Sequence, residues 1–527
     1  MKRPGVFVGL GGLLSDAGCC VIKDGQLVSA VEQNKVSRYE RYAPFPEEAF
    51  QIALEAAGIT PAQIECLAIA RPFSRGSESE ALLTLRSRFP KAEIVVVEHH
   101  VAHAASAYYP SGFPEAAVLS ADRAGDYRSA TLFHAKGTQI TAQRELYFPD
   151  SIGDIFNRTT ELLGYRPRSD EHKVQWLSTT AEPLHKDVFL DLLHGSGLAW
   201  PRIERKYLDP GSSSHGGFSR YFLDRLNLSG SESIPHTKRA EIAASVQAAV
   251  NETVARMIGE SESVCMAGGL ALNALLIASL EERYAHVFVQ PAAGNAGTAL
   301  GAAFHAWHVV FGRQERIPLP TLCLGPRYAL EETKRILENC KLRFRLLLTE
   351  EDVIHEALRS LADNEIVAWM HGRMEFGPRA LGNRSILASP LNPYSTENLN
   401  VYIKRREASR KFAASVPAEL AGEYFEARAN SRFLATVARV KSAHRKTFEA
   451  ALLGNNLIRL HTVDKAENPL YHALLTEVGK KTGLPVLYNT SFNLFGDPLV
   501  CTPRDAVRSF YSSGVDSLYV GNFLLKK

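Results

Sequence analysis

Apolar runs and tight turns near the start of the chain predict β-strands followed by a helix. Positions 6–10 form a continuous apolar run, which is typical of a buried strand. Two further strands are expected at 19–22 and 27–31, because these segments flank Asp24-Gly25, a strong signal for a two-residue hairpin. A helix is expected at 46–58, where a proline stands at the start and a glycine at the end.

The same order of elements returns roughly a hundred residues later in the chain. Positions 117–121 predict a strand that ends at Asp122, and 129–135 predict a second strand that turns at Lys136-Gly137 into a third. Each unit carries an acidic residue, Asp16 or Asp122, near its first strand. The repeat indicates the duplicated ribonuclease-H-like halves of the actin and sugar-kinase superfamily, with a ligand cleft between the halves.

A proline-containing segment divides the chain into two predicted domains. Pro318 and Pro320 cannot continue a helix. At 527 residues the chain is also too long for a single hydrophobic core. We therefore expect one domain over residues 1–318 and a second domain, also α/β, over residues 319–527.

Composition and charge are those of an ordinary globular protein and argue against several classes of partner. Hydrophobic residues make up 45% of the chain and charged residues 22%, and the net charge of +3 is spread along it. No charged tail or block requires a nucleic acid or a membrane, so neither is expected as a partner. The seven cysteines form no C-x-x-C pair, which argues against a zinc ribbon and favours reduced thiols in a cytoplasmic location.

A pair of histidines suggests a metal site. His99 and His103 stand four apart among helix-forming residues, so both imidazoles fall on one face of a helix, as a shared metal ion requires. Asp122 is the candidate third ligand. With 17 histidines, about half of one such pair is expected by chance, and an Asp at a strand end often only caps a turn. Both interpretations stay open from the residues alone.

Two glycine-rich segments are candidates for phosphate binding. Gly268-Gly269 follows an apolar strand at 264–267 and precedes a helix expected to begin near Ala271. Glycines let a phosphate approach backbone N–H groups at the positive end of a helix, although many such junctions are only tight turns. A second segment, 294–301, precedes another helix and is a candidate to close the same pocket.

The segment 372–385 is rich in arginine and glycine. Its three arginines, with Asn383, predict an oxyanion-binding loop, whereas a merely solvated basic loop would not need the neighbouring Met, Phe and Leu. Lys404 and Arg410 follow, and the polar segment 489–493 comes after a predicted strand. Together these residues predict a site for a nucleotide triphosphate.

These segments resemble the O-carbamoyltransferases of the NodU and CmcH type. The resemblance covers essentially the whole chain. It is carried by residues 99–107, 268–273, 290–294, 372–386, 485–493 and 521–525. The match at 372–386 is nearly word for word and is highly specific.

The resemblance implies an enzyme with two active centres. The C-terminal domain is similar to the YrdC-type enzymes of tRNA threonylcarbamoylation and is expected to make carbamoyl-adenylate from carbamoyl phosphate and ATP. The N-terminal domain is expected to hold the adenylate on a divalent metal while a small-molecule hydroxyl attacks the carbamoyl carbon. Iron(II) is the expected ion, and magnesium is the alternative.

The candidate site residues follow from the motifs and the resemblance. The catalytic candidates are Arg379, Lys404, Arg410 and Ser491; the nucleotide- and phosphate-binding candidates are Gly268, Gly269, Asn273, Arg459, Asn489 and Asn493; the metal-ligand candidates are His99, His103, Asp122 and Asn295.

Three positions depart from the pattern of that family. Asn295 stands where the metal-site pattern has Asp, and a neutral amide leaves a bound cation with one more positive charge. Ser15 stands where the family carries His before the first-strand Asp, which puts a base role at that position in doubt. Ala414 replaces the proline of an Ala-Pro-Ser pattern, and this change is expected to be minor.

Two other functions are compatible with the sequence. One is a tRNA threonylcarbamoylation-type enzyme, although that pathway divides the two domains between separate proteins. The other is a catalytically weakened nucleotide-binding regulatory protein, which Asn295 favours and the intact Lys404, Arg410 and Ser491 oppose. The identity of the acceptor and the oligomeric state cannot be read from the sequence; acceptor-specific residues are expected in 178–236.

Overall fold

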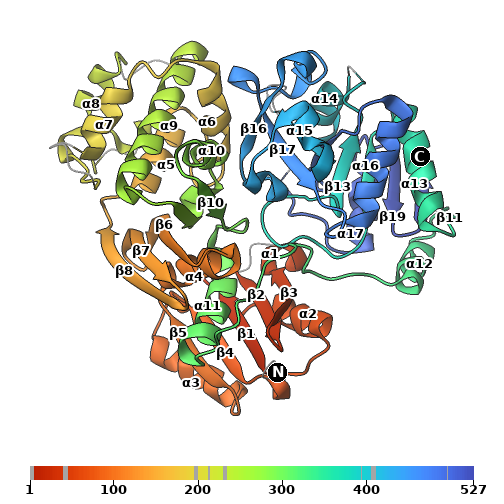
Figure 1. Cartoon of the computed structure of the whole chain (residues 1–527), viewed down its shortest axis with the longest axis horizontal. Helices are drawn as coiled ribbons and strands as arrows, with labels where there is room; N and C mark the ends of the chain where they lie inside the picture. The colour runs from red at the N-terminus through yellow and green to blue at the C-terminus, as the bar shows by residue number, and fades with distance from the viewer. Residues whose placement is uncertain are drawn as a thin grey trace.

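The structure is a computed structural model that describes residues 5–38, 45–194, 200–211, 214–228, 234–392, 394–404, 411–494 and 496–527. Elements coloured red to green in Figure 1 form two β-sheets with their helices, and the elements coloured teal to blue form a third sheet beside them.

Two five-stranded sheets repeat one topology. The first comprises β1 (Val6–Gly11), β2 (Gly18–Lys23), β3 (Gln26–Glu32), β4 (Cys66–Ala70) and β5 (Glu93–Val97), and the second comprises β6 (Glu115–Gly125), β7 (Arg128–Lys136), β8 (Gln139–Tyr147), β9 (Ser263–Ala267) and β10 (His286–Val289). In each sheet the first three strands form an antiparallel meander, and the fourth and fifth run parallel to the first, in the order 3-2-1-4-5. This is the ribonuclease-H-like topology, so the predicted duplication is confirmed.

Local turn chemistry explains the first hairpin and the helix after it. Asp24 and Gly25 have positive φ angles of 51° and 74°, as a type I′ turn requires at both central positions. The residues on either side of this turn, Lys23 and Gln26, pair across β2 and β3. Helix α2 (Glu47–Ala57) ends at Gly58, whose φ of 61° is left-handed. Both elements therefore form where the sequence predicts them.

Two helices pack against each other between the two repeated sheets. α4 (His99–Ser111) contacts β6 and β9, and α11 (Thr298–His305) contacts β1 and β4 (Figure 1). The helices approach so closely that a Cβ at Gly301 would lie 1.6 Å from the carbonyl oxygen of Ala102. The outer faces are covered by α2 and α3 (Glu78–Arg88) on the first sheet and by α5 (Ile152–Leu162), α9 (His236–Ile258) and α10 (Ala274–Arg283) on the second.

The third sheet is mixed and has ten strands in the described residues. They are β11 (Arg345–Leu346), β12 (Val367–Met370), β13 (Arg384–Ala388), β14 (Ala413–Pro417), β15 (Phe425–Glu426), β16 (Val437–Val440), β17 (Leu457–Val463), β18 (Leu487–Ser491), β19 (Ser517–Val520) and β20 (Phe523–Lys526), in the order 11-20-19-12-13-18-14-17-16-15. One face packs on α13 (Glu350–Ala362) and α16 (Pro469–Thr482), the other on α12 (Leu330–Asn339) and α17 (Pro503–Tyr511). The C-terminal part is therefore α/β, as predicted.

The segment between Val310 and Leu330 contains no helix or strand, and it includes Pro318 and Pro320. The segment packs against the N-terminal part, because Leu319 and Leu322 are buried in the same apolar cluster as α4 and α11. The limits 1–318 and 319–527 for two domains stay a prediction.

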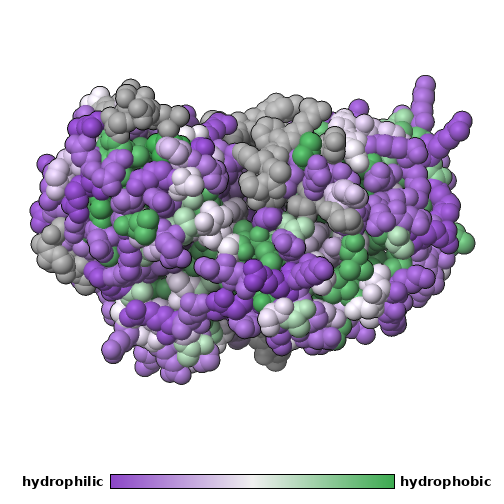
Figure 2. Space-filling model, turned by 90° about the horizontal axis from the view of Figure 1, so that it is seen from above, coloured by the Kyte–Doolittle hydropathy of each residue, from purple (hydrophilic) through white to green (hydrophobic). Residues whose placement is uncertain are grey.

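Hydrophilic residues cover most of the face of the molecule drawn in Figure 2. Among the helices that the structure describes, none combines the length and the apolar character needed to cross a membrane.

Asn430 joins the C-terminal part to the edge of the second sheet. Its side-chain amide donates hydrogen bonds to the Val287 carbonyl and to Glu281 Oε1, each at 2.8 Å, and its Oδ1 accepts one from the Val289 N–H at 3.1 Å. Val287 and Val289 belong to β10, the edge strand, whose open N–H and C=O groups need partners. Asn430 is buried and supplies them.

We predict that Asn430→Ala lowers the free energy of unfolding by about 2–3 kcal/mol, because it leaves buried polar groups of β10 without partners. The measurement is the midpoint of urea unfolding. Glu282→Ala is the matched control at the same interface: its side chain is 60% exposed and its ion pair with Arg428 is expected to contribute less than about 1 kcal/mol. Equal midpoints for Asn430→Ala and the wild type would show that this contact does not hold the parts together.

Candidate functional site

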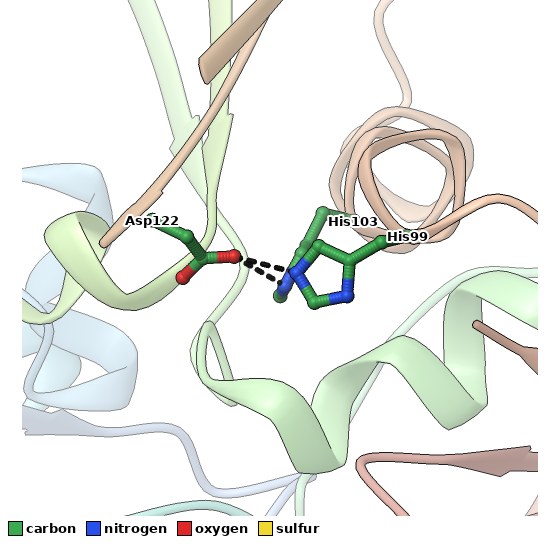
Figure 3. Close-up of side chains that lie close together, drawn as sticks. All are labelled: His99, His103 and Asp122. Carbon is green, nitrogen blue, oxygen red and sulfur yellow. Dashed lines mark hydrogen bonds and ion pairs between the residues drawn. The ribbon is translucent and has the colours of Figure 1, made fainter. Parts of the chain in front are cut away.

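His99, His103 and Asp122 come together from α4 and β6, with both imidazoles turned toward the carboxylate (Figure 3). Glu98 caps the helix by accepting hydrogen bonds from the backbone N–H groups of His100 and Val101. Because α4 begins at His99, the spacing of four places both histidines on one face. Asp122 Oδ2 lies 2.7 Å from His99 Nε2 and 3.1 Å from His103 Nε2. The three candidate ligand atoms lie within 4.8 Å of one another.

The hydrogen bonds around His99 and His103 leave imidazole nitrogens available to bind a cation. His99 Nδ1 lies 3.1 Å from the Arg71 carbonyl oxygen, which can only accept, so Nδ1 carries the proton. A neutral His99 then directs the lone pair of Nε2 at the carboxylate, and only a proton or a cation between the two atoms relieves the repulsion. His103 Nδ1 is buried without a hydrogen-bond partner, and His103 Nε2 faces the Asp122 carboxylate at 3.1 Å. These residues fit a divalent metal, which binds neutral imidazole and carboxylate.

The pKa values of the cluster follow from burial and from mutual attraction. Burial alone raises the pKa of Asp122, but the two histidines outweigh it and hold that pKa well below its ordinary value. Burial lowers the pKa of His103. Burial also lowers the pKa of His99, but the hydrogen bond and the charge of Asp122, together with the Arg71 carbonyl and the Glu98 carboxylate, outweigh it, and the pKa of His99 lies above its ordinary value. Asp122 is therefore a carboxylate, the form that binds a cation.

The Gly268-Gly269 junction orients Asp122. Gly268 has a φ of 91°, and a Cβ there would lie 2.3 Å from the Ala121 carbonyl oxygen, so only glycine fits. The Gly269 N–H donates to Asp122 Oδ1, leaving Oδ2 for the histidines. Strand β6 accordingly does not end at Asp122 but continues to Gly125 with an irregular register.

Helix α10 begins three residues later than the sequence predicted. Residues Gly269–Leu272 form a 3₁₀ turn, and α10 starts at Ala274 instead of near Ala271. The reason is Asn273, whose Oδ1 accepts the Leu276 N–H at 3.0 Å and caps the helix. Its amide also donates to Gln247 Oε1 at 2.8 Å. Asn273, predicted to bind the nucleotide, thus has two structural contacts and also lines the cavity described next.

A cavity of about 510 Å³ lies between the parts of the chain. Its lining combines Asp122, Gly269, Asn273 and Asn295 of the N-terminal part with Arg379 and Arg459 of the C-terminal part. Arg379 Nη2 donates to the Leu272 carbonyl at 3.5 Å, and the Arg459 guanidinium lies 5.4 Å from the centre of the Trp176 ring. Six of the predicted residues therefore meet around one space, which is of a size that suits a small molecule.

Three other predicted residues, Lys404, Ser491 and Asn493, contact one another. Lys404 Nζ donates to the carbonyl oxygens of Ser491 and Asn493, at 2.5 and 3.0 Å, and to Asn493 Oδ1 at 2.6 Å. Ser491 Oγ donates to the same Oδ1 at 2.9 Å. Asn489, on the same strand, donates to Ser415 Oγ at 3.2 Å. Lys404 therefore ties the 491–493 turn together. Arg410 lies outside the described residues.

The interpretation of 372–385 as a loop of three phosphate-binding arginines is corrected for two of them. Arg373 donates to the carbonyl oxygens of Leu324 and Gly325, at 2.5 and 2.9 Å. Arg384 is completely buried and donates to backbone carbonyls, with the His371 oxygen at 2.7 Å. Irregular backbone carries carbonyls that need donors, and these arginines supply them. Of the three, Arg379 alone lines the cavity.

A wall of the cavity was not anticipated from the sequence. It comes from α5, from α6 (Glu171–Leu177) and from the segment between them, with Asn157, Arg168, Glu171 and His172 among the lining residues. The segment 178–236, where acceptor-specific residues were expected, contributes none of the lining in the part of the chain that the structure describes. The sequence carries no signal for this wall, because its polar residues resemble any exposed helix face.

Ser15 and Asn295, two of the departures from the family pattern, contact each other. Asn295 Nδ2 donates to Ser15 Oγ at 2.7 Å, which leaves Asn295 Oδ1 as the only ligand atom of that amide. Asn295 begins a 3₁₀ turn that leads into α11, and it lines the same cavity as Asp122.

Comparison with known proteins identifies the family. The profile described as Carbamoyltransferase N-terminus matches residues 76–304, and the profile described as Carbamoyltransferase C-terminus matches residues 358–527. Nodulation protein NolNO of Sinorhizobium fredii is 31% identical over 98% of this chain and 79% of its own length. The chain belongs to the carbamoyltransferase family, as its motifs predicted.

Two further relatives extend the comparison. An uncharacterized protein of Synechocystis is 32% identical over 99% of this chain and 96% of its own length. The 3'-hydroxymethylcephem-O-carbamoyltransferase of Amycolatopsis lactamdurans is 30% identical over 51% of this chain and 50% of its own length. The family is one of transferases that includes O-carbamoyltransferases.

We predict that Asn295→Asp tightens the binding of Mn²⁺ to the nucleotide-free protein on the order of tenfold. Two neutral imidazoles and one carboxylate leave a divalent cation with a charge of +1, which a second carboxylate neutralises. The measurement is calorimetric titration with Mn²⁺. Asn157→Asp, which adds the same charge to the same cavity from α5, is the control and is expected to change the affinity less. Equal affinity in the wild type and in Asn295→Asp would mean that residue 295 does not touch the metal.

Proposed function

We propose that the protein makes carbamoyl-adenylate from carbamoyl phosphate and ATP and then transfers the carbamoyl group to a hydroxyl of a small molecule. One observation carries the proposal: a single cavity is lined by the Asp122 carboxylate of the histidine cluster and by Arg379 and Arg459 of the C-terminal part. Guanidinium groups stay charged and bind phosphate oxygens through paired hydrogen bonds.

The proposed reaction balances in three steps. Carbamoyl phosphate is hydrolysed to carbamate and inorganic phosphate. A carbamate oxygen attacks the α-phosphorus of ATP, and pyrophosphate leaves. The acceptor oxygen then attacks the carbamoyl carbon, its proton passes to a base, and AMP leaves with the electron pair of the broken C–O bond. Carbamate is short-lived in water, so a shared closed space protects it.

The two halves of the chemistry are assigned to different clusters. Adenylate formation is assigned to the C-terminal part, where Arg379 and Arg459 contact phosphate and Lys404 holds the Ser491–Asn493 turn in shape. Transfer is assigned to the neighbourhood of His99, His103 and Asp122. A divalent cation bound by these three side chains, with Asn295 as a weak fourth ligand, would offset the charge that develops on the leaving AMP. Iron(II) is the ion we expect there.

A second function from a different class is a regulatory protein that binds a nucleotide but turns it over weakly. Asn295 is the observation that favours it, because loss of a carboxylate ligand weakens metal binding. The two proposals differ in one measurable product, since sustained release of pyrophosphate is expected of the enzyme alone.

We predict that the purified protein releases pyrophosphate from ATP only when carbamoyl phosphate is present. Arg459→Ala is expected to slow this release about a hundredfold, close to 3 kcal/mol of transition-state stabilisation. Arg439→Ala is the control, because Arg439 lies on the neighbouring strand β16 and pairs at the surface with Glu426. No pyrophosphate under any condition would favour the regulatory protein; equal rates for Arg459→Ala and Arg439→Ala would reject the site.

We predict that His99→Ala stops carbamoyl transfer and leaves pyrophosphate release largely intact, because the histidine belongs to the transfer cluster. Pyrophosphate release reports the first half-reaction, and AMP release with a panel of hydroxyl compounds that includes 3'-hydroxymethylcephem reports the second. His134→Ala, on β7 with a side chain that is 43% exposed, is the control for replacing a histidine. Loss of both half-reactions in a folded His99→Ala variant would contradict a division of the chemistry between two clusters.

A further inference from the structure

A short helix of the N-terminal part is hydrogen-bonded to the loop that carries Arg379. Lys35 lies in α1 (Gln33–Ser37), is 6% exposed, and donates hydrogen bonds to the carbonyl oxygens of Glu375 and Gly377 at 3.0 and 2.5 Å. It also forms an ion pair with Glu32, whose Oε2 accepts the Gly377 N–H at 2.8 Å. The ammonium group thus has an acceptor for each of its three protons. We call Glu32 and Lys35 the clamp.

A buried carboxylate at the start of this loop accepts hydrogen bonds from the backbone at its end. Glu375 is completely buried, and its Oε1 accepts the backbone N–H groups of Leu381, Asn383 and Arg384 at 2.8 to 3.1 Å. The loop from 375 to 384 is therefore held together by its own carboxylate, and its placement against the N-terminal part needs separate contacts.

The clamp sets that placement at Gly377. This glycine has a φ of 102°, and a Cβ there would lie 3.2 Å from the Cβ of Ala292, in the segment that leads to Asn295. Gly377 therefore lies between α1 on one side and the 290–295 segment on the other. Pro378 and Arg379 follow directly and line the cavity.

We infer that the Glu32–Lys35 clamp is a positioning device that holds Arg379 in the cavity, acting through the backbone at Gly377. The inference rests on the proposed function, in which Arg379 contacts phosphate. A buried ion pair is weak evidence for a gain in stability, because desolvation offsets most of its attraction. The clamp instead fixes geometry. It holds the carbonyl groups of residues 375 and 377 and the N–H group of residue 377 in place, and residue 377 is two positions before Arg379.

A double-mutant cycle tests the clamp. Lys35→Met is expected to lower kcat/KM for carbamoyl-phosphate-dependent pyrophosphate release between about tenfold and a hundredfold, since small displacements of a positioning group cost that much. Arg379→Ala is expected to lower it at least as far. If Lys35 acts through Arg379, the double variant is no slower than Arg379→Ala alone.

Arg38→Ala is the matched control. Arg38 follows the same helix and also reaches the C-terminal part, donating to the Leu499 carbonyl at 2.6 Å and pairing with Asp497 and Asp505, but it does not touch the 375–379 backbone. Its effect, whether on stability or rate, is expected to be the same in the wild type and in the Arg379→Ala background.

The outcomes separate the inference from the proposed function. A Lys35→Met penalty that persists in full beside Arg379→Ala overturns the clamp as a positioning device. An Arg379→Ala variant with wild-type kcat/KM instead overturns the assignment of Arg379 to phosphate. Glu32→Gln keeps an acceptor for the Gly377 N–H while removing the charge on which Lys35 depends. If Lys35→Met does not fold, the same cycle run with Glu32→Gln decides the question, and an additive result there counts against the clamp.

Discussion

The cavity depends on the docking of the 375–384 loop against the N-terminal part. Phe376 and Leu381 of this loop are buried in the apolar cluster that also contains α4 and α11. Burial of two large side chains brings the backbone of an irregular loop into a dry environment, where every polar group needs a partner. Glu375, Arg384 and Lys35 supply those partners. The cavity exists because this loop forms part of its lining from the C-terminal side.

A second constraint acts on the histidine cluster. The imidazoles come from a helix between the two repeated sheets, and the carboxylate comes from an irregular part of β6. The carboxylate and the imidazoles meet at hydrogen-bond distance because the backbone packs closely beside each of them. Gly301 lies against Ala102, next to His103, and Gly268, with its positive φ, lies against Ala121, next to Asp122. These glycines are fixed by sterics alone, so the precision of the site comes from the scaffold rather than from the side chains themselves.

Features with a local cause could be predicted from the sequence, and features with a distant cause could not. The hairpin at Asp24-Gly25 and the pairing of His99 with His103 depend on spacing and turn chemistry within a few residues. The duplication was visible because both halves use the same local signals. By contrast, Arg373 and Arg384 resemble phosphate ligands in the sequence, and only the folded chain shows that the carbonyls of Leu324 and His371 need them. The start of α10 was placed too early because the capping role of Asn273 competes with the helix propensity of the residues before it.

Ser15 and Asn295 stand at two positions where the sequence departs from the expected family pattern, and their side chains contact each other. A histidine beside a carboxylate is an interacting pair in which each partner stabilises the charge of the other. Replacing only the carboxylate would remove that stabilisation, and replacing only the histidine would leave the carboxylate without its neighbour. Here both positions are neutral, and the hydroxyl and the amide still meet through a hydrogen bond of 2.7 Å. The contact between Ser15 and the segment before α11 is therefore made without an ionised group. Because the Asn295 amide donates to Ser15, its oxygen is the atom left to bind a cation, and Asn295 lines the same cavity as Asp122.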